Sequence, residues 1–393
     1  MKAFNSTLAG YGTTVFEVMS RLAAQHKTIN LGQGFPDEEG PAAMLESLAS
    51  ATRQYPNQYP PMMGVAELRQ AVAAHDRRFY DLEADWQTEV MVCSGATEAL
   101  AASILALVEP GDEVVLFEPL YDSYLPMVKR AGGKPRLVRL EPPEWHIPWD
   151  ELNAAFSDKT KCILFNTPMN PTGKVFSRDE LETLGGLLEK FDCYAICDEV
   201  YEHLVFDGRA HIPLMTLPGM RERCIRIASA GKTFSMTGWK VGYITASPAL
   251  LGIVARAHQF LVFTTPPNLQ RAVAYGLDHE QKWYTQLGRD LEAKRDLLED
   301  GLARVGFQVL PCHSTYFMNV DFRPLAFDVG FDGGDVDFCR YLTVEAGVTA
   351  VPVSALYASD DIDHLIRFCF CKRDDVLNAA LDRLGAHFSK RSA

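Results

Sequence analysis

The sequence predicts an α/β fold whose large domain has a mostly parallel sheet flanked by helices, together with a smaller α+β domain. Short apolar runs without polar alternation recur along the chain, and such runs are typical of strands buried on both faces of a parallel sheet. Helical repeats lie between them, for example at Leu100, Ile104 and Leu107, and again over residues 179–191. This alternation of strand and helix indicates the α/β class. The expected strands are residues 90–93, 114–117, 163–165, 194–197, 225–228 and 241–245.

The C-terminal part of the chain has a different pattern. Residues 283–302 are charged on one face and apolar on the other, which predicts a long helix that ends near Gly301 and Gly306. Single cores stop growing at about 250 to 300 residues, so we expect two domains. They are an N-terminal arm with part of the small domain at 1–45, the large domain at 46–277 and the C-terminal small domain at 278–393. Within the last, we expect strands at 307–310, 316–320 and 366–371 and helices at 335–345 and 374–387.

Composition and charge exclude several classes of function. The formal net charge of −13 comes from 51 acidic against 38 basic residues spread along the chain, which argues against a nucleic-acid surface. The nine cysteines form no Cys-x-x-Cys pair and several lie in the apolar runs, so we expect reduced core thiols in a cytoplasmic protein without a metal site. Residues 1–16 lack the pattern of a secretory signal, and the apolar stretch at 99–108 is too short to cross a bilayer. We therefore expect a small-molecule partner, no nucleic acid and no membrane.

Polar and glycine-containing segments follow the expected strands at the point where each strand ends. Sheets of this class bind ligands beyond the carboxyl ends of their strands. Residues far apart in the sequence are therefore expected to meet at one edge of the sheet. These segments are residues 94–97, 118–121, 166–173, 198–201 and 229–232.

Lys232 and Asp198 are the most informative residues of these segments. A lysine amine reacts with an aldehyde, and a carboxylate keeps a pyridine nitrogen protonated, and a pyridoxal phosphate (PLP) enzyme needs both groups. A nucleotide-binding P-loop would require glycine where Arg226 stands. The Ser229-x-x-Lys232 pattern of serine acyl-enzymes lacks its companion motifs Ser-Asp-Asn and Lys-Thr-Gly. The other alternative is an exposed lysine on a turn, and the neighbouring strand ends argue against it.

Several motifs occur in the order found in one enzyme family. They are Leu31-Gly-Gln-Gly-Phe-Pro-Asp37, Asn170-Pro-Thr-Gly173, Asp198-Glu-Val-Tyr201, the segment from Ser229 to Gly242 and Ile366-Arg-Phe-Cys-Phe370. Together they resemble the class I and II aminotransferases of PLP-dependent transferase fold type I, and most of all the branch of kynurenine aminotransferases and bacterial methionine aminotransferases. The similarity runs from about Phe16 to the C-terminal helix and implies that the large domain binds PLP.

The resemblance implies a role for residues around the cofactor ring. Lys232 is expected to hold PLP covalently and then to move a proton at the substrate Cα, which requires a lowered pKa. Asp198 is expected to pair with the protonated pyridine nitrogen. Tyr201 and Asn170 are expected to hydrogen-bond the O3′ oxygen of the cofactor, and Tyr121 is expected to stack on its ring.

The resemblance also implies a phosphate site that two subunits share. Backbone N–H groups at a helix N-terminus and a nearby cation suit a phosphate dianion. Tyr59 matches the family tyrosine that reaches the phosphate of the other subunit, so a homodimer is expected, and Tyr55 is the alternative to it. The phosphate ligands expected within one chain are Gly95, Ala96, Thr97, Ser229 and Lys240.

The substrate positions follow from the same resemblance. Arg367 is expected to bind the α-carboxylate with both ends of its guanidinium, helped by Asn170 and by the backbone of Gly34. No arginine stands next to Phe263 to receive a second carboxylate. Methionine, phenylalanine, tyrosine, kynurenine and glutamine are the expected amino donors, with a 2-oxo acid as acceptor in a two-step exchange. The aromatic residues expected around the substrate side chain are Phe16, Tyr121 and Phe263.

Two other functions are compatible with parts of this pattern. A PLP-dependent β-lyase that cleaves the carbon–sulfur bond of cysteine conjugates is the alternative reaction, because removal of the same Cα proton allows a thiol to leave from Cβ. A non-catalytic regulatory protein would lack the lysine or carry a DNA-binding segment. Lys232 is present and the N-terminal segment is too short for such a domain, so an enzyme is expected.

Overall fold

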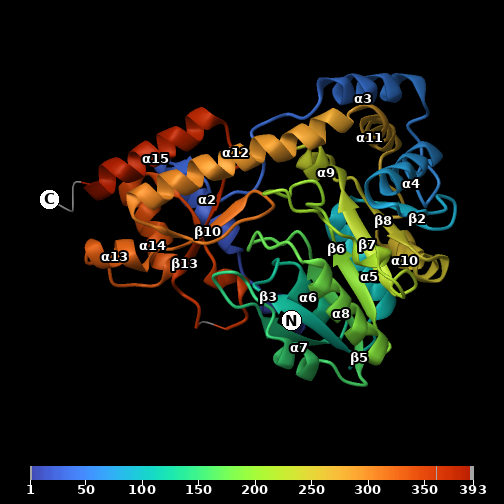
Figure 1. Ribbon diagram of the computed structural model, residues 1–393. Helices are drawn as coiled ribbons and strands as arrows, with labels where there is room; N and C mark the ends of the chain where they lie inside the picture. The colour runs from blue at the N-terminus through green and yellow to red at the C-terminus, as the bar shows by residue number, and fades with distance from the viewer. Residues whose placement is uncertain (1, 360, 390–393) are drawn as a thin grey trace.

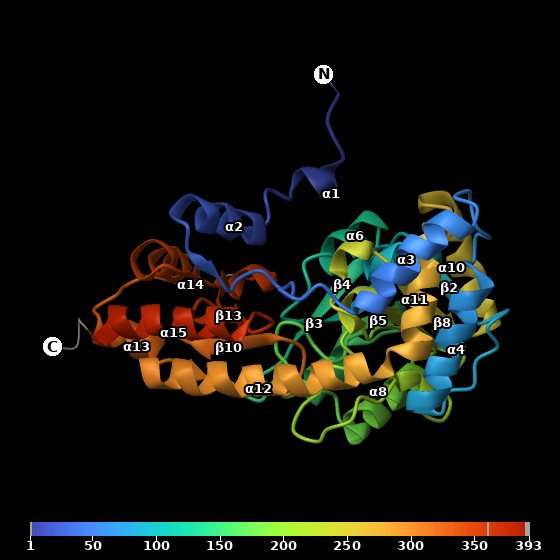
Figure 2. The same cartoon turned by 90° about the horizontal axis from the view of Figure 1, so that it is seen from above.

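The structure is a computed structural model that describes residues 2–359 and 361–389. A large sheet with its helices forms one part of the molecule, and a smaller group of strands and helices forms the other (Figure 1). The long helix α12 (Gln281–Val305) runs from the large part along the small part, as Figure 2 shows from above. It covers the predicted helix at 283–302 and ends where Gly306 adopts a left-handed conformation with φ 114°.

The large part is built on a seven-stranded sheet with the order β2-β8-β7-β6-β5-β3-β4. Strands β3 to β7 pair in parallel, whereas β8 runs antiparallel to both of its neighbours, so the predicted mostly parallel sheet is confirmed. The strands are β2 (Val90–Cys93), β3 (Glu113–Glu118), β4 (Lys134–Arg139), β5 (Thr160–Asn166), β6 (Tyr194–Asp198), β7 (Cys224–Ser229) and β8 (Gly242–Ala246).

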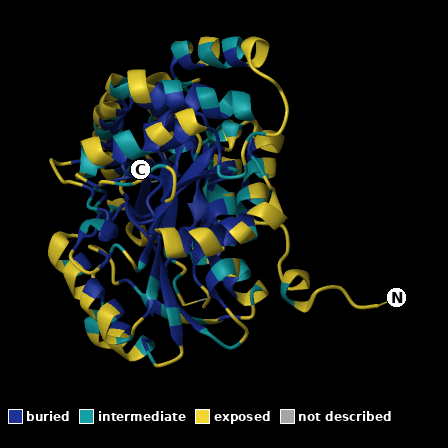
Figure 3. Cartoon of the chain, turned by 90° about the vertical axis from the view of Figure 1, so that its right-hand side faces the viewer, coloured by how far each residue is buried: buried dark blue, intermediate teal, exposed yellow. Residues whose placement is uncertain are grey.

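Helices cover both faces of this sheet, which explains the continuous apolar runs. Alternate residues of one strand face opposite sides, so Leu116 packs in the cluster with α5 and α10, and Phe117 packs in the cluster with α8. Figure 3 shows the sheet buried at the centre and the exposed residues on the outer helices. The helices are α3 (Ala42–Gln54), α4 (Ala66–Tyr80), α5 (Gly95–Leu107), α6 (Tyr124–Arg130), α7 (Trp149–Ala155), α8 (Arg178–Lys190), α9 (Ala230–Thr233), α10 (Pro248–Leu261) and α11 (Pro267–His279).

Two local features show how the sequence specifies these elements. Helix α8 begins at a capping box, in which the Ser177 hydroxyl accepts from the Glu180 N–H and the Glu180 carboxylate accepts from the Ser177 N–H. Strand β4 was not predicted from the sequence. It lies at the edge of the sheet, where Lys134 and Arg136 are exposed, and an edge strand with charged residues lacks the apolar run of its buried neighbours.

The small part contains a four-stranded antiparallel sheet and the N-terminal segment. Strand β1 (Ile29–Asn30) pairs in parallel with β11 (Val348–Thr349), so residues from both ends of the chain lie side by side here. The domain boundaries at 45 and 277 stay a prediction. The sheet, in the order β12-β13-β10-β9, contains β9 (Gln308–Val309), β10 (Phe317–Asp321), β12 (Val351–Pro352) and β13 (Leu365–Cys369). The helices are α1 (Ser6–Ala9), α2 (Val15–His26), α13 (Arg323–Asp328), α14 (Asp335–Tyr341) with a π-helical extension over Leu342–Ala346, and α15 (Asp374–Ser389).

The expectations from composition agree with the burial pattern. All nine cysteines are buried, as expected of core thiols. Across residues 2–359 and 361–389, no helix combines the length and the apolar character needed to cross a membrane.

Candidate active site

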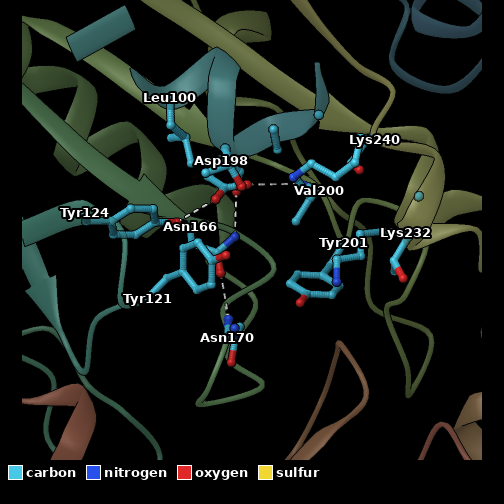
Figure 4. Close-up of a pocket in the computed structure, with 16 residues that line it drawn as sticks. Leu100, Tyr121, Tyr124, Asn166, Asn170, Asp198, Val200, Tyr201, Lys232 and Lys240 are labelled. Carbon is cyan, nitrogen blue, oxygen red and sulfur yellow. Dashed lines mark hydrogen bonds between the residues drawn. The ribbon is translucent and has the colours of Figure 1, made fainter. Parts of the chain in front are cut away.

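The carboxyl ends of the parallel strands of the large sheet meet at one pocket (Figure 4). Segments that follow β2, β3, β5, β6 and β7 all contribute to its wall, as the order of the strands predicts. The predicted site residues that line this pocket are Gly95, Ala96, Thr97, Tyr121, Asn170, Asp198, Tyr201, Ser229, Lys232 and Lys240.

Lys232 lies in the short helix α9 directly after β7, and it is half-buried. Burial lowers the pKa of its amine from the ordinary lysine value to about 8. The amine donates a hydrogen bond of 2.7 Å to the Tyr316 hydroxyl, which in turn donates to the Gly34 carbonyl at 2.9 Å. An amine with this pKa is partly neutral near physiological pH and can act as a nucleophile or a base. Tyr316 was not predicted from the sequence, since no motif marks it.

Asp198 ends β6 and is buried at the base of the pocket. Burial raises the pKa of its carboxyl to about 6, and the Tyr124 hydroxyl opposes this by donating a hydrogen bond of 2.6 Å to one carboxylate oxygen. Asn166 donates to the Asp198 carbonyl at 2.7 Å, and its own side-chain oxygen accepts from the Asn170 N–H at 2.7 Å. Tyr124 and Asn166 were not predicted from the sequence. Asn166 nevertheless stands at the end of β5, where the register of β5 and β6 pairs it with Asp198.

The turn before α5 has the features of a phosphate site. Helix α5 begins at Gly95, whose φ of 76° favours glycine. A β-carbon at Gly95 would lie 3.3 Å from the Lys240 ammonium nitrogen, so this cation lies directly against the turn. A β-carbon at Gly242 of β8 would lie 2.7 Å from the Gly95 carbonyl carbon, so the strand can approach the turn only as glycine. Free N–H groups, the helix dipole and a lysine together suit an anion.

Arg367 on β13 is a buried cation without a carboxylate partner. One terminal nitrogen donates to the Asn170 side chain at 2.8 Å, and its Nε has no hydrogen-bond partner. Its guanidinium carbon lies 3.9 Å from the centroid of the Phe317 ring and 5.1 Å from that of Phe16. None of the ion pairs formed among the described residues includes Arg367. A buried guanidinium in this state favours binding of a carboxylate.

Gly34 is needed for a reason that the sequence did not show. A β-carbon at this position would lie 2.3 Å from the Phe317 ring, which is the ring stacked on Arg367. A side chain at Gly34 would therefore displace Phe317 and the guanidinium that rests on it. The Gly34 carbonyl is occupied by the Tyr316 hydroxyl.

Tyr59 and Phe263 do not line this pocket of their own chain. Their rings contact each other edge-to-face with centroids 5.5 Å apart, and Tyr59 is 82% exposed. The expectation that Phe263 surrounds the substrate is therefore not met within one chain, because the residue follows α10 on the outside of the large part. The alternative residue Tyr55 is engaged elsewhere, with its ring centroid 4.2 Å from the Arg271 guanidinium.

An apolar cavity of about 390 Å³ opens beside Tyr121. Phe16 lines it, and Asp122 is the one charged residue in its wall among those that the structure describes. The other lining residues are Leu8, Tyr11, Gly12, Thr13, Thr14, Val15, Leu120, Leu125, Pro126, Ala355, Leu356 and Tyr357.

The pocket has the chemical groups that PLP requires. It offers an amine with a lowered pKa for the aldehyde, a buried carboxyl for the ring nitrogen and a helix N-terminus with a lysine for the phosphate. These residues come from the ends of separate strands, and the fold brings them together around one pocket (Figure 4). The donor set therefore fits the cofactor.

Comparisons with known proteins agree with this site. The family model for aminotransferase class I and II matches residues 26–384. The probable N-succinyldiaminopimelate aminotransferase DapC of Mycobacterium tuberculosis is 45% identical, over 96% of this chain and 97% of its own. The kynurenine–oxoglutarate transaminase of Dictyostelium discoideum is 37% identical, over 96% of this chain and 94% of its own. The solved structure of Escherichia coli YbdL, identified as having a methionine aminotransferase function, is 40% identical with a TM-score of 0.94, covering 98% of this chain and 100% of that chain.

Proposed function

Because this chain belongs to the class I and II aminotransferases, which depend on PLP, we propose that it transfers the amino group of a hydrophobic, sulfur-containing or aromatic L-amino acid to a 2-oxo acid. The family and the fold that the motifs predicted are thereby confirmed. The observation that carries the proposed substrate class is the buried guanidinium of Arg367, which has an unsatisfied Nε and lies against Phe16, a residue that lines the apolar cavity. That combination suits an amino acid with one carboxylate and an apolar side chain.

Each residue around the cofactor has a defined task in this proposal. When bound, PLP supplies an electron sink for the electron pair that remains when the substrate Cα loses its proton. Asp198 keeps the ring nitrogen protonated, and Tyr124 keeps Asp198 ionised by donating to it at 2.6 Å. The turn at Gly95 and Lys240 hold the phosphate.

Arg367 and Lys232 act on the substrate itself in this proposal. The guanidinium of Arg367 binds the α-carboxylate, with Asn170 fixing one of its nitrogens at 2.8 Å. Holding the carboxylate directs which bond at Cα breaks, because the bond perpendicular to the cofactor ring is the one activated. Lys232, with its lowered pKa, accepts the proton from the substrate Cα and then donates it to the cofactor.

The walls of the site favour a short monocarboxylate over an extended acidic substrate. N-succinyldiaminopimelate, for which the Mycobacterium tuberculosis relative is named, carries carboxylates far from its reacting amine. The apolar cavity has no lysine or arginine among its described lining residues, and its charged residue, Asp122, repels a carboxylate. The repulsion from Asp122 does not affect donors whose side chains carry no anion, namely methionine, phenylalanine, tyrosine, kynurenine and glutamine.

A panel of amino donors tests the proposal. The purified enzyme is given each donor with a 2-oxo acid, and formation of the new keto acid is followed. We expect methionine and the aromatic amino acids to have higher kcat/KM than aspartate and N-succinyldiaminopimelate. Higher kcat/KM for either acidic donor would contradict the substrate class. Release of pyruvate and a thiol from cystathionine, faster than transfer from methionine, would instead favour the β-lyase.

The exposed position of Tyr59 supports a homodimer with shared sites. Tyr59 lies on the surface of its own chain beside Phe263, which is consistent with the expectation that it reaches the phosphate of a second subunit. Mixing two variants, each with one defective residue of the shared site, tests this arrangement. A Lys232→Ala chain retains a normal Tyr59, and a Tyr59→Phe chain retains a normal Lys232, so their heterodimer contains one complete site. Activity that does not exceed the sum of the two separate variants would contradict the shared site.

A further inference from the structure

His258 is a fully buried histidine that no step of the proposed reaction uses. It lies near the end of α10, which packs against α5 on one face of the large sheet (Figure 1). Its Nδ1 is 3.0 Å from a carboxylate oxygen of Glu98, and its Nε2 is 3.2 Å from the Met62 carbonyl oxygen. The ring thus joins helix α5 to the segment that precedes α4.

The Glu98 hydrogen bond leads to the phosphate turn. The second carboxylate oxygen of Glu98 accepts the Ser94 N–H at 3.0 Å, and Ser94 directly precedes Gly95. The first turn of α5 is therefore closed by a side chain that His258 holds in place. The Cys93 thiol also contacts this carboxylate, so without His258 the Glu98 side chain would keep one of its two neighbours and lose the one that links it to α10.

The Met62 hydrogen bond leads to the loop that carries Tyr59. This loop is fixed at its C-terminal end, where Val65 donates to the Gln270 side chain at 2.8 Å and Val92 donates to the Met63 carbonyl at 3.0 Å. Between that anchor and the exposed Tyr59, the Met62 carbonyl is held by His258.

The backbone carbonyl of His258 also fixes the segment that contacts Tyr59. Its carbonyl accepts the N–H groups of Val262 and Phe263, both at 3.1 Å. Phe263 is the ring against which Tyr59 packs. The Tyr59 loop and its aromatic neighbour are therefore both held at one residue of α10.

The chemistry of these contacts makes His258 hard to replace. Both ring nitrogens face oxygen atoms, and these two oxygens belong to segments far apart in the sequence. A substitution that removes the ring leaves buried polar atoms of both segments without this partner.

We propose that His258 is a positioning residue that couples the phosphate turn of its own subunit to the Tyr59 loop. It sets the affinity for the phosphate group without touching it, through Glu98 on one side and Met62 on the other. The inference rests on the proposed function, in which the turn at Gly95 binds the phosphate of PLP and Tyr59 reaches the phosphate of the partner site.

Two substitutions separate the two hydrogen bonds. In His258→Asn the amide nitrogen takes the place of Nδ1 and keeps the Glu98 hydrogen bond, whereas in His258→Gln it takes the place of Nε2 and keeps the Met62 hydrogen bond. Val254→Ala is the matched control, because Val254 lies one turn earlier on α10, is equally buried and belongs to an apolar core cluster. It loosens α10 without removing either hydrogen bond.

Cofactor binding is the first measurement. The dissociation constant of PLP is measured by titration of the full-length apo-protein, and the rise in its melting temperature with inorganic phosphate is measured in parallel. We expect both His258 variants to raise the PLP dissociation constant about tenfold, the loss typical of one charge-assisted hydrogen bond. We expect Val254→Ala to lower the melting temperature but to leave the PLP dissociation constant unchanged. His258 variants that bind PLP as tightly as the Val254→Ala variant would overturn the inference.

A double-mutant cycle with Tyr59→Phe is the second measurement. If His258→Asn acts by releasing the Tyr59 loop, adding Tyr59→Phe causes little further loss of PLP affinity, whereas the losses from His258→Gln and Tyr59→Phe add. Additive losses in both pairs would overturn the coupling to the Tyr59 loop. Should the His258 variants fail to fold, Glu98→Ala removes both the acceptor of the Ser94 N–H and the partner of His258, and at least the same rise in the PLP dissociation constant is expected from it. A wild-type protein that binds neither PLP nor phosphate would instead contradict the proposed function.

Discussion

Replacing Tyr124 with phenylalanine removes one hydrogen bond from the acid beneath the cofactor and leaves the ring in place. The Tyr124 hydroxyl donates at 2.6 Å to Asp198, which is 4% exposed and whose pKa is raised by burial to about 6. The bond favours the ionised carboxylate, because a carboxylate accepts a hydrogen bond more strongly than a carboxylic acid does. Tyr124→Phe therefore raises the pKa of Asp198 further.

The size of the effect follows from the type of bond. A hydrogen bond to a charged group contributes about 1.5–3 kcal/mol, which equals about 1 to 2 pH units in the pKa of the carboxyl. Because burial already raises the pKa of Asp198 to about 6, the further rise leaves about half to nine-tenths of the carboxyl protonated at pH 7. A protonated Asp198 does not stabilise a protonated pyridine nitrogen, and we expect kcat at pH 7 to fall by about 2-fold to 10-fold.

The assay is kcat for methionine and a 2-oxo acid, measured as a function of pH. We expect the acid limb of the profile to move to higher pH in Tyr124→Phe. Tyr80→Phe is the matched control, because Tyr80 donates a hydrogen bond of 2.7 Å to another buried acid, Glu202, away from the pocket. The control is expected to lose stability and to keep the wild-type profile. A Tyr124→Phe enzyme with unchanged kcat and an unchanged acid limb would refute the reasoning.

Three further substitutions test the other groups of the pocket. Arg367→Ala is expected to raise KM and to lower kcat/KM for methionine by about 2–5 kcal/mol of transition-state stabilisation, and an unchanged kcat/KM would exclude Arg367 from the site. The folded pKa of Asp198 lies above the unfolded value, so its contribution to apo-protein stability is complete at low pH and is lost as pH rises through about 6. Between the unfolded pKa of 3.8 and the folded pKa of about 6, the free energy of unfolding of the wild type, measured in urea, should thus fall by about 3 kcal/mol relative to that of Asp198→Asn. The same pH dependence of stability in both proteins would contradict the assignment. Tyr316→Phe removes an acceptor from the Lys232 ammonium and should lower the pKa of Lys232 below about 8, measured as the pH dependence of PLP capture by the apo-protein.

The main sheet and the pocket at its edge were predictable because of how the strands are buried. A strand with helices on both faces has apolar residues at consecutive positions, as at Val114 and Val115, and this pattern is visible in a single sequence. The ends of such strands meet at one edge, so Lys232 and Asp198 could be placed together before their distance was known. Strand β4 lacks this signal, because an edge strand exposes alternate residues to solvent.

The residues that the sequence did not predict act through hydrogen bonds to predicted ones. Tyr124, Asn166 and Tyr316 have no motif of their own, and each was found only through its bond to a neighbour in space. Tyr59 and Phe263 show the opposite case, since a motif marks them but the fold of one chain leaves them outside the pocket. The resemblance assigns these two residues to the site, and in the proposed homodimer they would reach the site of the second subunit.

The buried charges of the pocket explain why its ligands must also stabilise the fold. Burial lowers the pKa of Lys232 and raises that of Asp198, so each group is held away from its preferred ionisation state, and the guanidinium of Arg367 is buried without an anion. In the proposed reaction, a protonated ring nitrogen, a covalent bond to the amine and a substrate carboxylate would each remove one of these costs. Part of the affinity for cofactor and substrate would then originate in the buried charges of the protein rather than in new contacts.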